Sequence, residues 1–568
     1  KNPYQYNKKI WFYLHFKTVA GSVLMIVHKD LEKIFFIFFK IYYIINRSRI
    51  SKPINLNKSF FDLYIGGSKM HYESTRGGLK SVLSAEAIKQ GIAPDGGLFV
   101  PEKKVKFSMD EIKSFAGMNY RERAVHILKP YLTDYSDEEI KDCVYSAYTE
   151  EKFGHPGIAP LYRLNENVNI LELWHGPTCA FKDMALQILP HFLVKAVRKT
   201  GESSEIVILV ATSGDTGKAA LEGFKDVDGT RIIVFFPENG VSLVQKMQMV
   251  TQEGKNVYSI GVEGNFDDAQ NGVKAIFTDD ALKIKMEANR FRFSSANSIN
   301  WGRLVPQIVY YFSAYADMIN NGEIQAGDKI NIVVPTGNFG NILAAFYAME
   351  MGLPVNRLIC ASNDNNVLTD FINTGVYDRN REFKRTISPS MDILISSNLE
   401  RLLFELTDHD STYIVKWMNQ LKNDGRYTVD PDIHKKISNI FWSDFSTEVE
   451  TLKTIEAIYK EYKYVIDTHT AVGVDVYDKY VISTGDMTKT VIASTASPFK
   501  FNASVVKAIL GEDALKDRNE FELLDILSKE CSLTIPEGLK DLDKRTVKHK
   551  IVCSSSDMKQ QVEKLLGI

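Results

Sequence analysis

The chain has 568 residues, of which 44% are hydrophobic and 25% are charged, and its formal net charge is −2. A chain of this length exceeds what one simple core holds, so we expect two or more domains. The near-neutral charge gives no electrostatic basis for a nucleic-acid partner. The five cysteines are scattered, include no zinc-binding spacing and fit a reducing compartment, so we expect no metal site.

Residues 1–69 differ in composition from the rest of the chain. They hold twelve Lys and Arg residues against three acidic ones, among many Ile, Phe, Tyr and Asn residues. The apolar run Ile34–Ile45 is shorter than the roughly 20 residues of a membrane-spanning helix, and no cleavage site of signal-peptide type follows it. We therefore predict an extension without function before a working protein that starts at Met70, and no membrane partner. A weak membrane-surface anchor is the alternative.

Residues 70–165 have the pattern of a small α/β domain. Helices are expected over 110–116 and 137–148, where the opening acidic residues suit helix N-termini. Arg76 is flanked by two hydroxyl residues and two glycines and could bind an anion. A solvated turn arginine is the alternative interpretation.

From about residue 166 strands and helices alternate, which is typical of a doubly wound parallel sheet. Three apolar strands end in loops of small or hydroxyl residues, at 211–217, 336–341 and 494–501. Loops of this kind direct backbone N–H groups, and a following helix dipole, at an anion. The first two loops match neither the Walker pattern nor the dinucleotide-binding pattern, so a nucleotide is not the favoured ligand.

A fourth strand-to-helix junction presents a lysine. The apolar run Asn169–Trp174 is broken by Gly176–Pro177, and helical periodicity follows Lys182. The apolar neighbour Phe181 disfavours the ammonium form of Lys182, which leaves an amine suited to imine formation. A surface lysine that opens a helix is the alternative. We interpret nearby Cys179 as a small apolar filler.

The strand–helix alternation lapses between residues 363 and 464. That segment is rich in helix formers at apolar spacing, so we predict a mainly helical insertion, after which the sheet resumes at Val465. The tail 511–568 is expected to close on the main body. The predicted domains are thus an extension (1–69), an N-terminal domain (70–165), a catalytic core (166–362), the insertion (363–464) and a return to the core with the tail (465–568).

Pyridoxal phosphate carries every group that these residues could bind. It has a carbonyl for Lys182, a phosphate for a glycine-rich loop, and a ring nitrogen and a hydroxyl for a Thr or Ser. The chain resembles the threonine synthase family, which are fold-type II (tryptophan synthase β-like) pyridoxal-phosphate enzymes. The matching stretches run in the family's order from Tyr72 to Phe501: YESTRGG, APDGGLF, LELWHGPTCAFKDMALQ, ATSGDTG, SANSINWGR, VPTGNFGN and STASPFKF. SPSMDILISSNLER is similar to a stretch of the longer, fungal and Gram-negative members. The implied fold is two lobes of doubly wound parallel sheet.

The resemblance implies a role for particular residues. Lys182 would be the catalytic residue and the point of cofactor attachment, with Phe181 beside the cofactor ring and Thr495 facing the pyridine nitrogen. The phosphate of the cofactor would lie in a cup of five residues, Gly337, Asn338, Phe339, Gly340 and Asn341. The substrate α-carboxylate and the cofactor hydroxyl would meet Ser213, Asp215 and Thr216. The substrate phosphate would meet some of Ser74, Thr75, Arg76, Ser298, Asn300, Arg303 and Lys500.

The residues themselves leave alternatives to these substrate contacts. Arg303 also fits a structural ion pair, and Ser298 and Asn300 also fit helix capping.

The activity that the resemblance implies is the conversion of O-phospho-L-homoserine and water to L-threonine and phosphate. It would be a carbon–oxygen lyase reaction on a phosphate, by γ-elimination and β-addition, in the last step of threonine biosynthesis. A phospholyase that releases 2-oxobutyrate from the same substrate would share every motif, and a non-catalytic relative is the third alternative. We expect a cytoplasmic enzyme that is a monomer or homodimer.

Overall fold

A small antiparallel sheet opens the described part of the chain, which is residues 69–212 and 214–568 of a computed structural model. Strand β1 (His71–Ser74) lies between β2 (Val82–Leu83) and β3 (Phe99–Pro101). The predictions for residues 1–68 and for Ser213 lie outside the described residues. Short helices surround this sheet: α4 (Ser84–Gln90), α5 (Met109–Ser114), α6 (Tyr120–Leu128), α7 (Asp137–Ala147) and α8 (Glu150–Phe153). Capping boxes begin α5, α6 and α7, so local sequence decides where these helices start.

The central sheet has six strands in the order β14-β11-β10-β15-β5-β4. Neighbouring strands are parallel except β4 and β5. The strands are β4 (Leu161–Arg163), β5 (Val168–Glu172), β10 (Ile330–Pro335), β11 (Val355–Ser362), β14 (Phe441–Phe445) and β15 (Thr490–Ser494). Because β5, β15 and β10 are adjacent and parallel, the loops that follow them meet at one edge of the sheet.

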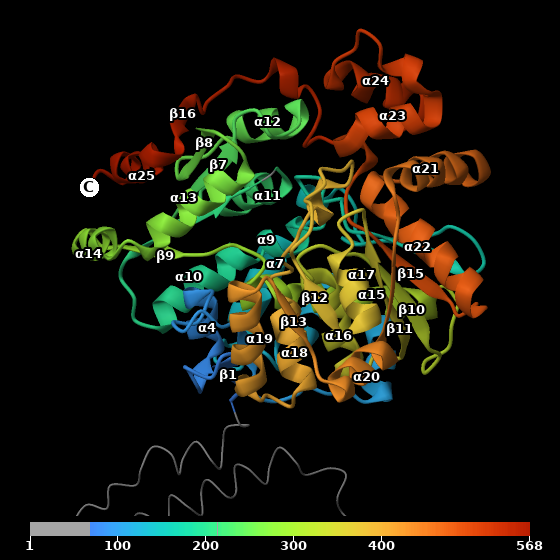
Figure 1. Cartoon of the computed structure of the whole chain (residues 1–568), viewed down its shortest axis with the longest axis horizontal. Coiled ribbons are helices and arrows are strands. Elements are labelled where there is room, and N and C mark those ends of the chain that lie inside the picture. The colour runs from blue at the N-terminus through green and yellow to red at the C-terminus, as the bar shows by residue number, and fades with distance from the viewer. Residues whose placement is uncertain (1–68, 213) are drawn as a thin grey trace, which may run out of the picture. The chain divides into compact units, whose positions relative to one another are not determined.

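A second, fully parallel sheet has the order β16-β8-β7-β6-β9. Its strands are β6 (Glu205–Ala211), β7 (Thr230–Pro237), β8 (Val257–Glu263), β9 (Phe291–Ser294) and β16 (Ile551–Ser554). In Figure 1 the chain end, with β16 and α25 (Met558–Leu566), lies beside β8 and α13 (Phe266–Thr278), away from α23 (Asn502–Leu510) and α24 (Glu520–Cys531). Two parallel, helix-covered sheets confirm the predicted fold class.

Helices join and cover the two sheets. The helix after Lys182 is divided into α9 (Asp183–Leu186) and α10 (Leu189–Lys199), because Pro190 occupies the first turn of a new helix. Helix α15 (Trp301–Asn320) is buried along nearly all its length and packs on α16 (Gly340–Glu350), as expected for a helix that is apolar all round. The others in this part are α11 (Asp215–Phe224), α12 (Leu243–Val250) and α14 (Asp280–Ala288).

The segment 363–464 is mainly helical, but it also contributes to the sheets. Its helices are α17 (Val367–Thr374), α18 (Leu399–Leu406), α19 (Ser411–Asn423), α20 (Pro431–Ile440) and α21 (Glu448–Tyr462). Strands β12 (Val376–Asp378) and β13 (Arg426–Thr428) pair with each other, and β14 pairs with β11. The expectation that the sheet resumes at Val465 is wrong, because β14 already rejoins the central sheet at Phe441. Val465 lies in the loop before helix α22 (Thr468–Thr484), which Asp467 caps.

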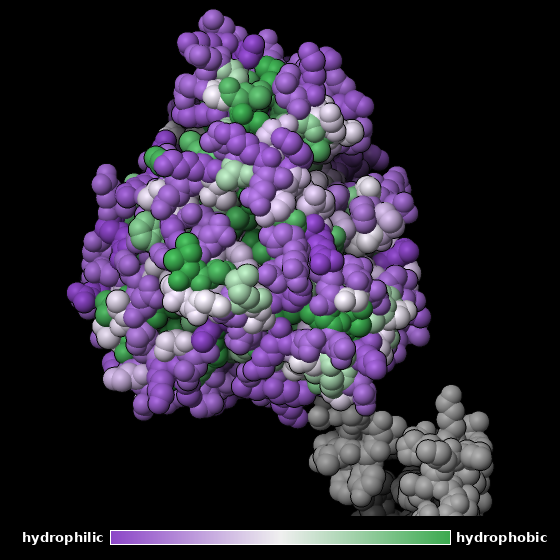
Figure 2. Space-filling view, turned by 90° about the vertical axis from the view of Figure 1, so that its right-hand side faces the viewer, coloured by the Kyte–Doolittle hydropathy of each residue, from purple (hydrophilic) through white to green (hydrophobic). Residues whose placement is uncertain are grey.

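Figure 2 views the side of the molecule that carries α21 and α22. Hydrophilic residues cover most of this face, and hydrophobic residues occur in small separate groups. The last turn of α22 exposes 85% of Ile482. Within residues 69–212 and 214–568, no helix combines the length and the apolar character that crossing a membrane requires.

Candidate active site

Lys182 lies in a loop that is held tightly between β5 and α9. The backbone N–H of Phe181 donates to the carbonyl oxygen of Thr495 at 2.8 Å, so this loop is tied to the loop after β15. The Asp183 carboxylate accepts from the backbone N–H of Thr178 at 2.8 Å and from its hydroxyl at 2.7 Å. A Cβ at Gly176 would collide with the Asp183 side chain, so only glycine fits there. The loop therefore presents Lys182 with little freedom.

Among the described residues, two polar side chains lie near the Lys182 amine. Its Nζ lies 3.4 Å from Oδ2 of Asp215 and 3.1 Å from Oγ of Ser390, and the side chain is 9% exposed. Burial lowers the pKa of Lys182, and although Asp215 raises it, the net shift is downward. The neutral amine is the form that attacks a carbonyl, so this is the environment that imine formation requires.

Asp215 is the buried counter-ion of two lysines. Its Oδ1 accepts from Nζ of Lys500 at 2.8 Å and from Nε2 of Gln245 at 2.9 Å. Burial alone would raise the pKa of Asp215, but Lys500 and Lys182 hold it well below its usual range. An ionised Asp215 can accept a hydrogen bond from the cofactor hydroxyl, which is one of its two predicted roles. Its contact with the substrate carboxylate stays a prediction.

The loop Gly337–Asn341 links β10 to α16. Phe339 begins the helix with a φ of 64°, and a Cβ at Gly337 would lie 2.7 Å from the carbonyl oxygen of Ser390. The Asn341 Oδ1 accepts from the hydroxyls of Tyr310 and Tyr311, whereas its buried Nδ2 has no partner in the described part of the chain. An unused donor at the N-terminus of a helix suits a phosphate group.

Arg303 is a buried cation that has no carboxylate partner among the described residues. Its Nη1 donates to the carbonyl oxygen of Ala296 at 2.9 Å, and its Nε is buried without a partner. Burial lowers its pKa to about 10. A structural ion pair is therefore not what the structure shows at this position. Because an unpaired buried guanidinium is costly, Arg303 fits a site that receives an anion. The Asn341 amide and its loop fit the phosphate of pyridoxal phosphate.

Other residues predicted to meet the substrate phosphate have partners of their own. Arg76 forms a two-pronged pair with Glu400, with both N···O distances at 3.0 Å, and the Thr75 hydroxyl donates to Glu400 at 2.6 Å. Ser74 donates to Asp95 at 2.7 Å. The structure thus pairs Arg76 and Thr75 with Glu400 of α18, and Ser74 with Asp95 in the loop before β3.

Asn300 and Lys500 are likewise engaged. The Asn300 Oδ1 caps α15 by accepting from the N–H of Gly302 at 2.9 Å, and its Nδ2 donates to two backbone carbonyls. Helix capping, the alternative interpretation for Asn300, therefore describes it. Lys500 donates to the carbonyl oxygen of Thr178 at 3.0 Å, to Gln248 at 3.2 Å and to Asp215, so each of its three N–H groups has a protein partner. Its contact with the substrate phosphate stays a prediction.

Three further predicted residues lie around the same edge. The Ser298 Oγ lies 3.3 Å from the Ser397 hydroxyl, beside the loop Gly337–Asn341 that Ser397 also contacts. Thr216 stands in the first turn of α11 next to Asp215, and Thr495 is bonded through its carbonyl to the Lys182 loop.

Sequence reasoning missed Ser390, Gln245 and Glu400. Ser390 and Glu400 fall in SPSMDILISSNLER, which the resemblance singled out without assigning roles. The similarity of that stretch to other family members was the only sign in the sequence that Ser390 and Glu400 matter. Their partners Lys182 and Arg76 lie far away in the sequence, and contacts of that kind leave no local pattern.

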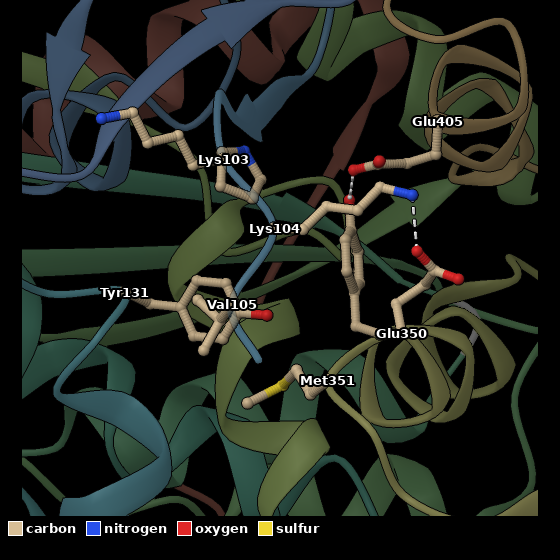
Figure 3. Close-up of a pocket in the computed structure, with 9 residues that line it drawn as sticks. Lys103, Lys104, Val105, Tyr131, Glu350, Met351 and Glu405 are labelled. Atoms are coloured by element: carbon tan, nitrogen blue, oxygen red, sulfur yellow. Dashed lines mark hydrogen bonds and ion pairs between the residues drawn. The ribbon is translucent and has the colours of Figure 1, made fainter. Parts of the chain in front are cut away.

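A separate small cavity lies between β3 and α16 (Figure 3). Its volume is about 10 Å³, enough for about one water molecule. Lys104 donates to Glu350 at 2.5 Å, and the Tyr347 hydroxyl donates to Glu405 at 2.9 Å at its rim. This cavity is too small for a cofactor and lies apart from Lys182.

Three family profiles match consecutive parts of the chain: threonine synthase N terminus over residues 71–148, pyridoxal-phosphate dependent enzyme over 154–431, and threonine synthase, C-terminal, over 470–562. The chain is 39% identical to threonine synthase of Pseudomonas aeruginosa over 449 residues, which covers 78% of this chain and 91% of that protein. It is 40% identical to threonine synthase-like 1 of Macaca fascicularis over 85% of this chain. The match spans 66% of the length of that relative.

Two solved structures have the same fold. The crystal structure of threonine synthase from yeast matches with a TM-score of 0.78 and 33% identity, and covers 88% of this chain and 99% of that one. The crystal structure of threonine synthase with bound pyridoxal phosphate from Brucella melitensis matches with a TM-score of 0.77 and 35% identity over 88% and 99% of the two chains. The cofactor prediction is thereby confirmed as pyridoxal phosphate. The chain belongs to the threonine synthase family of pyridoxal-phosphate-dependent enzymes.

Proposed function

We propose that the chain converts O-phospho-L-homoserine and water into L-threonine and phosphate. The observation that carries this proposal is Arg303, a buried guanidinium whose Nε has no partner among the described residues. The cofactor brings one phosphate, for which the loop Gly337–Asn341 is suited. Burial is the main cause of the lowered pKa of Lys182, and the charge of Arg303 adds to it, so Arg303 acts on the reactive amine. A buried cation there favours a substrate that carries a phosphate of its own.

The cofactor, when bound, withdraws electrons from the amine-bearing carbon of the substrate and so makes its hydrogen acidic. Lys182 would hold the cofactor, the loop Gly337–Asn341 would hold its phosphate, and Thr495 would face its ring nitrogen. Asp215 would accept a hydrogen bond from its hydroxyl.

The protein's own groups then have distinct tasks in the reaction. Lys182, whose lowered pKa favours the neutral amine, would remove the proton from Cα of the substrate. Arg303 would bind the substrate phosphate and stabilise it as it leaves Cγ, with Ser298 as a further donor. Asp215 and Lys500 neutralise each other, so the site gains no net charge from this pair. The activity is that of a carbon–oxygen lyase acting on a small phosphorylated amino acid.

The test is a product assay on the full chain with pyridoxal phosphate and O-phospho-L-homoserine, with Lys182→Ala as the inactive control. Threonine equal to phosphate, mole for mole, supports the proposal. Phosphate with 2-oxobutyrate in place of threonine would make the chain a phospholyase instead. If the yellow absorption of bound cofactor is present but no phosphate is released, O-phospho-L-homoserine is not the substrate. The cytoplasmic location and the monomer or homodimer stay predictions.

A further inference from the structure

Ser390 contacts the reactive amine, although no role has been assigned to it so far. It lies in the single turn η4 (Pro389–Met391), which the chain reaches long after Lys182. Its Oγ is 3.1 Å from Nζ of Lys182 and 3.5 Å from Oδ2 of Asp215. The three side chains therefore form a closed triangle of polar contacts.

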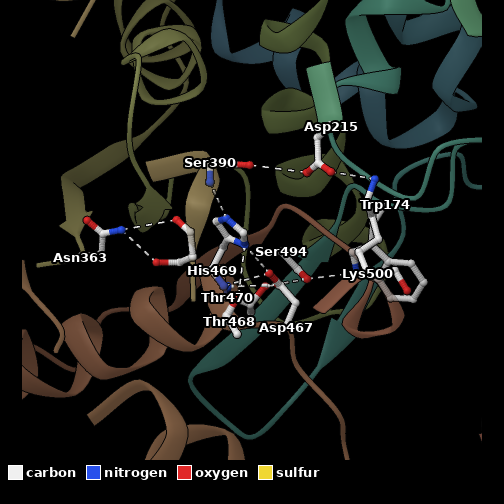
Figure 4. Close-up of polar contacts among 12 residues, drawn as sticks. Trp174, Asp215, Asn363, Ser390, Asp467, Thr468, His469, Thr470, Ser494 and Lys500 are labelled. Atoms are coloured by element: carbon white, nitrogen blue, oxygen red, sulfur yellow. Dashed lines mark hydrogen bonds and ion pairs between the residues drawn. The ribbon is translucent and has the colours of Figure 1, made fainter. Parts of the chain in front are cut away.

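The backbone of Ser390 is held by a buried histidine. The Ser390 N–H donates to Nε2 of His469 at 3.1 Å, and Nδ1 of His469 lies 2.8 Å from Oδ2 of Asp467. Because Nε2 accepts a hydrogen bond, the proton of the neutral ring belongs on Nδ1, where Asp467 accepts it. His469 is 2% exposed and Asp467 is fully buried. Figure 4 shows Ser390 between Asp215 and His469, with Asp467 beyond the ring.

The rest of the loop is fixed as firmly. Asn363, just after β11, donates through Nδ2 to the Ser388 hydroxyl at 3.0 Å and to Asp392 at 2.8 Å. On the other side the Ser390 carbonyl packs against Gly337, where even a methyl group would not fit. Anchors from β11, α22 and the phosphate loop thus hold one serine hydroxyl against one amine.

We propose that Ser390 is a positioning residue for the Lys182 amine and that the Asp467–His469 pair fixes it in place. A neutral amine has two N–H groups and one lone pair. When Lys182 donates one N–H to Asp215 and the other to Ser390, the direction of the lone pair is decided. The lone pair is the part of the amine that attacks the cofactor carbonyl and, under the proposed function, removes the substrate proton.

The experiment compares Ser390→Ala with Ser443→Ala in the full chain. Ser443 is a matched control, because it is a buried serine of β14 whose hydroxyl donates to the Cys360 carbonyl at 2.7 Å, away from Lys182. The first readout is the rate at which the cofactor-free protein becomes covalently loaded with pyridoxal phosphate, followed by its yellow absorption and by borohydride trapping at Lys182. The second is the split between kcat and KM for O-phospho-L-homoserine.

For Ser390→Ala we expect loading and kcat to fall by about 10- to 100-fold, as for a misplaced reacting group. We expect KM to change by less than about 3-fold, because Ser390 orients the amine and does not bind the substrate phosphate. Ser443→Ala should match the wild type in both readouts. Rates for Ser390→Ala within 2-fold of the wild type, or equal losses in both variants, would overturn the proposal.

A second pair of variants tests the histidine and covers the case in which Ser390→Ala does not fold. His469→Gln can place an acceptor oxygen near the former Nε2, whereas His469→Leu cannot. The expected result is slower loading for His469→Leu, with recovery in His469→Gln, and equal loading rates would refute the positioning role. The loading assay needs no substrate. It therefore tests the positioning role of Ser390 even if the wild type makes no threonine and the proposed function is wrong.

Discussion

Replacing Asp215 by Asn should strongly destabilise the cofactor-free protein. At an effective dielectric constant of about 20, one charge pair at the 2.8 Å of Lys500 or the 3.4 Å of Lys182 is worth about 5 to 6 kcal/mol. Relaxation and loss of a proton from one lysine reduce this figure, and removing one partner of a buried pair typically costs about 3 to 5 kcal/mol. Since about 1 kcal/mol shifts the thermal midpoint of a large domain by roughly 2 °C, we expect a fall of about 6 °C or more.

Calorimetry on the cofactor-free wild type and Asp215→Asn measures this change. Asp513→Asn, which breaks the exposed pair with Lys516, is the control and should shift the midpoint by less than about 2 °C. Because the folded pKa of Asp215 is depressed, its contribution is present above its unfolded pKa of about 4 and is lost as the pH falls further. The thermal midpoints of the wild type and Asp215→Asn should therefore become equal at acidic pH. A variant as stable as the wild type at neutral pH would refute the counter-ion argument.

Three further changes test other parts of the molecule. Arg303→Met should raise the thermal midpoint of the cofactor-free protein, because it removes an unpaired buried charge. It should lower kcat/KM by at least about 10-fold, because the charged hydrogen bonds to the substrate phosphate are lost. An unchanged kcat/KM would exclude Arg303 from substrate binding. Hydrogen bonds to Glu405 and Glu73 raise the pKa of His409 to about 9. The charged His409 therefore contributes fully to the stability of the fold below about pH 6.5, and this contribution disappears toward pH 9. A midpoint advantage over His409→Gln that persisted at higher pH would contradict this. Gly337→Ala should weaken cofactor binding by about 10-fold in a fluorescence titration, because its methyl group would strain the loop Gly337–Asn341. An unaltered affinity would argue that this loop does not hold the cofactor phosphate.

Local patterns predicted much of the fold. The apolar strands predicted before the loops 211–217 and 336–341 coincide with β6 and β10, and the acidic residues at the start of α7 predicted a helix N-terminus there. The place where the sheet resumes was wrong, because β14 rejoins the sheet at Phe441, and Val465 and Ile466 lie in the loop before α22. A short apolar run is not by itself evidence of a strand.

The chemical groups that the protein offers can be read from its sequence: a lysine at a strand–helix junction, glycine-rich loops after apolar strands, and an arginine at the start of a long apolar run. How those groups are paired depends on the tertiary structure. Arg76 is bound by Glu400 and Lys500 by Asp215, whereas Arg303 keeps an open donor. The contact of Ser390 with Lys182 joins residues 208 positions apart. Burial sets the charge state and the partner of each side chain, and burial depends on contacts that no local stretch of sequence contains.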